Sequence, residues 1–125
     1  MGQPAGIRVV IADDNDGLRM LLKAVLGLDD RLELVGEAAD GHETLAVVDE
    51  TDPDVLLLDL SMPALDGLQV LETLQRTRPG LKVIVYSGFA GADVRRAALA
   101  AGADDYLVKG VDPMQIVERL VATAG

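Results

Sequence analysis

Five short apolar runs recur along the chain, and each is followed by a stretch whose apolar residues have helical spacing. Short runs that are apolar throughout indicate strands buried on both faces. Strands that alternate with helices predict an α/β doubly wound fold, in which helices cover both faces of a mainly parallel sheet. The predicted strands are IRVVIA (7–12), LELVGE (32–37), DVLLLD (54–59), KVIVYS (82–87) and DYLVK (105–109).

The predicted helices differ in how much apolar area they can bury. In three of the five units, leucine, isoleucine and valine residues three and four apart form one helical stripe. The last helix is expected to begin at Pro113, with Asp112 as its N-cap. The helix over 92–102 is nearly all alanine on its apolar side, so either it is loosely held and movable, or its small side chains allow close packing. The stripe residues are Leu18, Leu21, Leu22, Val25, Leu26, Leu68, Leu71, Leu74, Ile116, Val117, Leu120 and Val121.

Composition excludes several classes of protein. The 125 residues suit one domain, and we expect a single domain over 1–125, with its core over about 7–122 and no output domain within the chain. A net charge of −10 disfavours direct nucleic-acid binding by this domain, because phosphate contacts need a basic surface. No apolar run reaches the roughly 20 residues of a membrane span, and the first residues do not form a signal peptide. With no cysteine either, we expect a cytoplasmic protein that makes no membrane contact.

Polar residues follow four of the five predicted strands, at the point where each strand ends. Asp13 and Asp14 follow the first strand, Asp59 ends the third, Ser87 ends the fourth and Lys109 ends the fifth. In an open parallel sheet, ligands bind outside the carboxyl ends of the strands. Each of these residues alone could cap a turn or face solvent, but together they predict one site at this edge of the sheet.

The charges of this predicted site favour a divalent cation. Three carboxylates opposed by one lysine leave a net negative charge, and like charges about 4 Å apart repel by about 4 kcal/mol at an effective dielectric constant near 20. Oxygen ligands with room for water and phosphate suit Mg²⁺. A carboxylate such as Asp59 can also act as a nucleophile toward phosphorus and form an aspartyl phosphate. Mg²⁺ and Lys109 can each take one phosphoryl oxygen, and the Ser87 hydroxyl can donate to a third.

At these residues the chain resembles the receiver domain of bacterial two-component response regulators. The resemblance rests on four segments in order, IADDN (11–15), LLLDLSMPALDGL (56–68), YSG (86–88) and YLVKG (106–110). Together these motifs are specific, although each one alone is weak. The resemblance implies a flavodoxin-like (βα)5 fold with the strand order 2-1-3-4-5.

The resemblance also implies a role for each site residue. Asp59 is implied as the phosphoacceptor and Lys109 as the lysine that contacts the phosphate. Mg²⁺ is implied to bind Asp14, Asp59 and the backbone carbonyl of Ser61, with Asp13 acting through a water.

A conformational switch is implied as well. Ser87 would move toward the phosphate and Tyr106 would turn inward, which changes the face formed by the fourth helix, the fifth strand and the fifth helix. Many receivers have proline after the lysine with a cis bond before it, whereas this chain has Gly110, so the geometry of the Lys109–Gly110 bond is open. Lys-Gly here and Ser-Met-Pro after Asp59 resemble the NarL/LuxR class, whose receivers usually precede a helix-turn-helix DNA-binding domain.

Several functions remain to be compared. The resemblance implies a sensor histidine kinase as phosphodonor, a DNA-binding output domain or other effector as target, and a homodimer that forms on phosphorylation. It also implies that the chain is not a turnover enzyme. One alternative is a stand-alone or phosphate-independent interaction module, and another is a Mg²⁺-dependent phosphohydrolase. The phosphohydrolase is disfavoured because such enzymes usually carry an acid where this chain has Ser61. Nucleotide binding is disfavoured because the sequence has neither a G-x-G-x-x-G motif after the first strand nor a G-x-x-x-x-G-K-[ST] motif.

Overall fold

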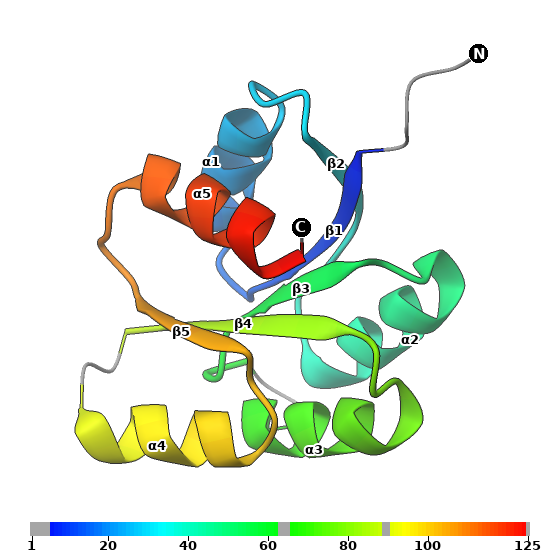
Figure 1. The fold of residues 1–125 in the computed structure, drawn as a ribbon, viewed down its shortest axis with the longest axis vertical. Coiled ribbons are helices and arrows are strands. Elements are labelled where there is room, and N and C mark those ends of the chain that lie inside the picture. The colour runs from blue at the N-terminus through cyan, green and yellow to red at the C-terminus, as the bar shows by residue number, and fades with distance from the viewer. Residues whose placement is uncertain (1–5, 63–65, 89–90, 125) are drawn as a thin grey trace.

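The five apolar runs form one parallel sheet in the computed structural model, which describes residues 6–62, 66–88 and 91–124. The strand order is β2-β1-β3-β4-β5, as the sequence predicts (Figure 1). Residues 63–65, in the segment after Asp59, lie outside the described ranges. The strands are β1 (Ile7–Ala12), β2 (Leu32–Ala38), β3 (Val55–Leu58), β4 (Lys82–Ser87) and β5 (Asp105–Val108).

Helices cover both faces of this sheet. α1 and α5 lie on one face, and α2, α3 and α4 lie on the other (Figure 1). As predicted, α5 begins at Pro113, and the Asp112 carboxylate accepts a 2.9 Å hydrogen bond from the backbone N–H of Met114. The helices are α1 (Asp16–Leu26), α2 (Gly41–Thr51), α3 (Gly67–Thr77), α4 (Ala92–Ala100) and α5 (Pro113–Ala124).

The run VLLL of β3 is apolar throughout because both of its faces are covered. Val55 and Leu57 pack in the cluster under α1 and α5, whereas Leu56 and Leu58 pack in the cluster under α2, α3 and α4. None of the four is more than 1% exposed. Burial of this strand on both sides fixes its depth in the sheet, and therefore fixes where Asp59 emerges at its carboxyl end.

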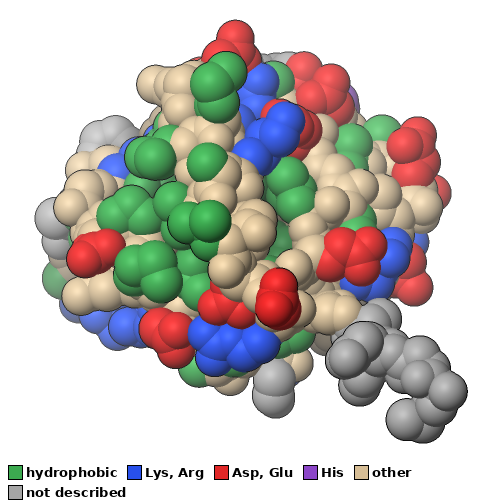
Figure 2. All heavy atoms as spheres, turned by 90° about the horizontal axis from the view of Figure 1, so that it is seen from above, with side chains coloured by type: hydrophobic (Ala, Val, Ile, Leu, Met, Phe, Trp, Pro, Cys, Tyr) green, Lys and Arg blue, Asp and Glu red, His purple; other side chains and the backbone are tan. Residues whose placement is uncertain are grey.

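Two helical faces differ from a simple leucine stripe. Leu21 was expected in the buried stripe of α1, but its side chain is 48% exposed, because the arc of α1 that meets the sheet is narrower than the apolar stripe. Figure 2 views the layer that holds α1 and α5 and shows hydrophobic side chains on its surface between charged ones. In α4, Ala98 is the one fully buried residue, so this helix meets the sheet through a narrow contact.

None of the helices in the described ranges has the length and apolarity needed to cross a membrane.

Candidate functional site

Asp13 and Asp59 meet at the carboxyl edge of the sheet because β1 and β3 are adjacent parallel strands. Their backbones continue the sheet pattern beyond the strands: the N–H of Asp13 donates to the Ala38 carbonyl at 3.0 Å, and the N–H of Asp59 donates to the Ala12 carbonyl at 2.9 Å. Each aspartate is only 1% exposed. The sheet therefore holds two carboxylates, which carry like charges, side by side with almost no access to water.

Lys109 brings a positive charge to this pair. Its Nζ lies 3.0 Å from Oδ2 of Asp13 and 3.2 Å from Oδ2 of Asp59. The end of β5 positions the lysine, since the Lys109 backbone N–H donates to the Ser87 carbonyl at 2.7 Å. The ammonium approaches both Oδ2 atoms at ion-pair distance, and neither oxygen has a hydrogen-bond partner among the described residues.

The other oxygen of each buried carboxylate is bonded to backbone. Oδ1 of Asp13 accepts from the N–H of Asn15 at 2.8 Å, and Oδ1 of Asp59 accepts from the N–H of Ser61 at 3.0 Å. These bonds orient each carboxylate so that its Oδ2 is left for a cation. Asn15 in turn caps α1, so the turn and the site are built from the same residues.

Asp14 completes an acidic cluster. Its side chain is exposed, and one carboxylate oxygen from each of Asp13, Asp14 and Asp59 lies within 4.8 Å of the others. The donor set consists of the buried Oδ2 atoms of Asp13 and Asp59 and the exposed carboxylate of Asp14. It is therefore open to solvent on one side. This set fits Mg²⁺, which binds one or two carboxylates and retains several waters.

The electrostatics of the pair follow from its burial. The pKa of Asp59 is raised, chiefly by burial and further by the neighbouring charge of Asp13, although the Ser61 N–H and Lys109 oppose the rise. Burial alone would lower the pKa of Lys109, but its contacts with Asp13 and Asp59 raise that pKa overall. The lysine therefore stays charged, and a second positive charge would relieve the carboxylates.

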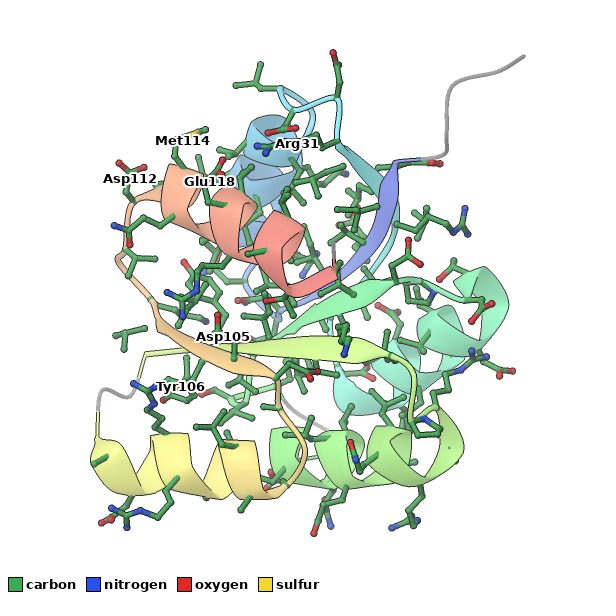
Figure 3. All side chains as sticks on the ribbon, viewed as in Figure 1. Arg31, Asp105, Tyr106, Asp112, Met114 and Glu118 are labelled. Atoms are coloured by element: carbon green, nitrogen blue, oxygen red, sulfur yellow. The ribbon has the colours of Figure 1, made fainter. Side chains whose placement is uncertain are left out.

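The predicted switch residues lie beside the acidic cluster. Ser87 ends β4 and is fully buried. Tyr106 is 7% exposed and packs between β5 and α4, in the cluster that contains Ala98 (Figure 3). The backbone has no cis peptide bond in the described residues, so the Lys109–Gly110 bond is trans, and Gly110 has φ +102°.

Two residues that sequence reasoning missed contact the site. Arg19 donates to the backbone carbonyl of Asp13 at 2.5 Å and to Glu37 of β2 at 3.1 Å, which braces the loop after β1. Tyr86 lies beneath Lys109, whose Nζ is 5.7 Å from the ring centroid. The alternation of β4 places Tyr86 on the face opposite Val85, but nothing in the sequence shows that a lysine from another strand covers it.

Comparison with known proteins agrees with this architecture. The family model for the response regulator receiver domain matches residues 9–121. The chemotaxis protein CheY of Thermotoga maritima is 34% identical, over 92% of this chain and 95% of CheY. The transcriptional regulatory protein YhcZ of Bacillus subtilis is 38% identical over 90% of this chain, which spans only 52% of YhcZ. The solved signal receiver domain of NarL from Mycobacterium tuberculosis is 32% identical with a TM-score of 0.93, covering 97% of this chain and 98% of that one.

The fold and these matches together place the chain in the class of α/β regulatory domains. The chain belongs to the response regulator receiver domain family, the signalling domain of two-component response regulators. The resemblance seen in the sequence motifs is thus confirmed, and the likeness to the NarL/LuxR class agrees with the NarL structure.

Proposed function

We propose that Asp59 accepts a phosphoryl group from a histidine residue of a sensor histidine kinase. The observation that carries this proposal is the state of Asp59, a carboxylate 1% exposed at the end of β3, held by one N–H and faced by one ammonium. A carboxylate oxygen of Asp59 would attack phosphorus while the bond from phosphorus to the histidine nitrogen breaks. Positioning and charge neutralisation are the main demands of such a transfer.

Asp13, Asp14, Asp59 and the carbonyl of Ser61 would hold Mg²⁺, with Asp13 acting through a water. Support comes from the acidic cluster and from the two buried Oδ2 atoms that lack hydrogen bonds in the described part of the chain. When bound, Mg²⁺ would supply positive charge at the phosphoryl oxygens. The protein's part is to orient the carboxylates, which the N–H groups of Asn15 and Ser61 support.

Lys109 and Ser87 would act on the phosphoryl oxygens. The ammonium of Lys109 already lies between the two buried carboxylates and would pair with one phosphoryl oxygen as negative charge is added. The Ser87 hydroxyl would donate to another. A move of Ser87 toward the phosphate would open space next to Tyr106, and α4 could then shift because Ala98 is its only fully buried residue.

The reaction belongs to a switch. The domain would assist its own phosphorylation and its own dephosphorylation, but it would not turn over a free substrate. Ser61, two residues after Asp59, supports this inference because it cannot supply the proton donor that aspartate-based phosphohydrolases usually carry there.

The domain would transmit this change to an effector. We infer one receiver domain over 1–125 with its core over about 7–122, which acts in the cytoplasm. Its target would be a DNA-binding output domain, as the YhcZ and NarL relatives suggest, or a second copy in a phosphorylation-dependent homodimer. Direct nucleic-acid binding by this domain is disfavoured by its net charge of −10.

Intact-mass measurement after incubation with acetyl phosphate tests the proposal. We expect one added phosphoryl group that requires both Mg²⁺ and Asp59, so that Asp59→Asn gives none. Asp93→Asn is a matched control, since Asp93 is an exposed aspartate on α4. Labelling that persists in Asp59→Asn would sink the assignment. No labelling of any form would favour the phosphate-independent module.

A further inference from the structure

Tyr86 occupies an unusual place beside the proposed phosphorylation site. Its side chain is 4% exposed and packs in the cluster under α1 and α5, on the face of β4 shared with Ile84. The Lys109 ammonium lies 5.7 Å from the centroid of its ring. A cation within about 6 Å of an aromatic face is attracted by the negative charge of that face.

We propose that Tyr86 is a positioning residue for Lys109, whose ammonium it holds at the phosphoryl-binding side of Asp59. The inference rests on the proposed function of Asp59 and adds a residue to it. Tyr86 acts through the lysine, because its own ring is buried in the core cluster.

The ion pairs with Asp13 and Asp59 hold only the tip of Lys109, so a further contact at the ammonium would help to fix its position. The Lys109 side chain is 27% exposed. Its ammonium reaches Asp13 and Asp59 at the end of a flexible chain of four carbons. The next residue, Gly110, has φ +102°, and a Cβ built there would meet nothing within 4 Å. No side chain therefore packs around the position of a Cβ at Gly110, next to the lysine.

Tyr86 restrains the charged end of this lysine. Its ring lies under the ammonium of Lys109. Burial raises the pKa of the Tyr86 hydroxyl, with Lys109 and Gly110 opposing the rise, so the hydroxyl stays protonated at neutral pH and its ring stays uncharged. The two carboxylates pull the ammonium from one side, and the ring supports it from another.

Two measurements on variants of the 125-residue chain test this role. The first is the rate of Mg²⁺-dependent phosphorylation by acetyl phosphate, followed by intact mass. The second is the chemical shift of the Lys109 side-chain methylene next to Nζ in metal-free protein, where a nearby ring produces a ring-current shift. The spectrum is simple because the other lysines are Lys23 and Lys82.

We expect Tyr86→Phe to keep the ring-current shift and nearly the wild-type rate. Tyr86→Leu should lose the shift and slow phosphorylation about fivefold, the size expected for loss of a partly buried cation–π contact. Ile84→Val is the matched control, because it perturbs the same strand face two residues before Tyr86 and should change neither. Tyr86→Met serves as a second ring-free variant if Tyr86→Leu does not fold.

The outcomes separate this inference from the proposed function. If wild-type protein is phosphorylated on Asp59 and the ring-free variants react as fast, Tyr86 has no positioning role. An unchanged Lys109 shift in those variants overturns the inference in the same way. If wild-type protein is never phosphorylated, the proposed function fails, while the Lys109 shift still decides whether Tyr86 holds the ammonium.

Discussion

Arg19 on α1 donates from its guanidinium to the backbone carbonyl of Asp13 at 2.5 Å. The same guanidinium is held by Glu37, 3.1 Å away on β2, and by an ion pair with Asp16. Its side chain is only 14% exposed. One residue thus ties the loop that carries Asp13 and Asp14 to the neighbouring strand.

Arg19→Gln is therefore expected to weaken Mg²⁺ binding. Residues that orient metal ligands typically change metal affinity about 10-fold or more when removed. Calorimetric titration with Mg²⁺ measures this affinity directly. Arg78→Gln is the charge-matched control, since Arg78 pairs with Asp49 and Asp52 at the other end of the molecule. Equal affinities of the two variants would show that only net charge matters.

Asp59→Asn is expected to stabilise the metal-free protein at neutral pH. Burial and Asp13 raise the pKa of Asp59, so the folded protein holds this proton more tightly than the unfolded chain does. That stabilisation is complete below the unfolded pKa, near pH 4, and is lost as the pH rises through the folded pKa. At pH 7 the ionised Asp59 therefore destabilises the fold, and replacing it should gain on the order of 1 kcal/mol.

Urea unfolding in a chelator checks this prediction at two pH values. Asp59→Asn should exceed wild type at pH 7 and approach it at pH 3.5, where the carboxyl is protonated in both states. Asp93→Asn, whose side chain is 96% exposed in the parent, should show little gain at either pH. A gain that is the same at both pH values would contradict the electrostatic cause.

Mg²⁺ itself is expected to raise the thermal stability of the protein. A ligand that binds only the folded state stabilises it by about 1.4 kcal/mol at ten times its Kd and about 2.7 kcal/mol at a hundred times. Thermal melts with increasing Mg²⁺, and with chelator added back, measure this gain. Asp13→Asn should lose most of it, whereas Glu72→Gln on the exposed face of α3 should keep it.

Ala98 tests how α4 is held. The sequence left open whether this alanine-rich helix moves or packs closely, and the structure buries Ala98 completely while Ala97 beside it is exposed. If the contact is close, Ala98→Leu overfills it and costs about 1–3 kcal/mol, whereas Ala97→Leu is nearly neutral. Denaturant unfolding of both variants measures the difference. A tolerated Ala98→Leu would indicate slack between α4 and the sheet.

Most of the fold could be predicted from the strand pattern. A short run that is apolar throughout, such as VLLL, is explained by a strand of a parallel sheet that is covered on both faces. The same rule brought Asp13, Asp59 and Lys109 together, since the carboxyl ends of parallel strands share one edge. The contacts of Arg19 and Tyr86 could not be predicted in this way. They depend on how far a side chain reaches across to another element, and strand periodicity gives only the face on which it starts.

The two tyrosines of the chain lie in different layers of the core, Tyr86 under α1 and α5 and Tyr106 under α2, α3 and α4. The chain has no tryptophan, so these two phenols account for nearly all of its near-ultraviolet absorption. Replacing either one with phenylalanine leaves an intrinsic optical probe of a single layer. Conformational changes near Lys109 and conformational changes near α4 can thus be followed separately, without an attached dye.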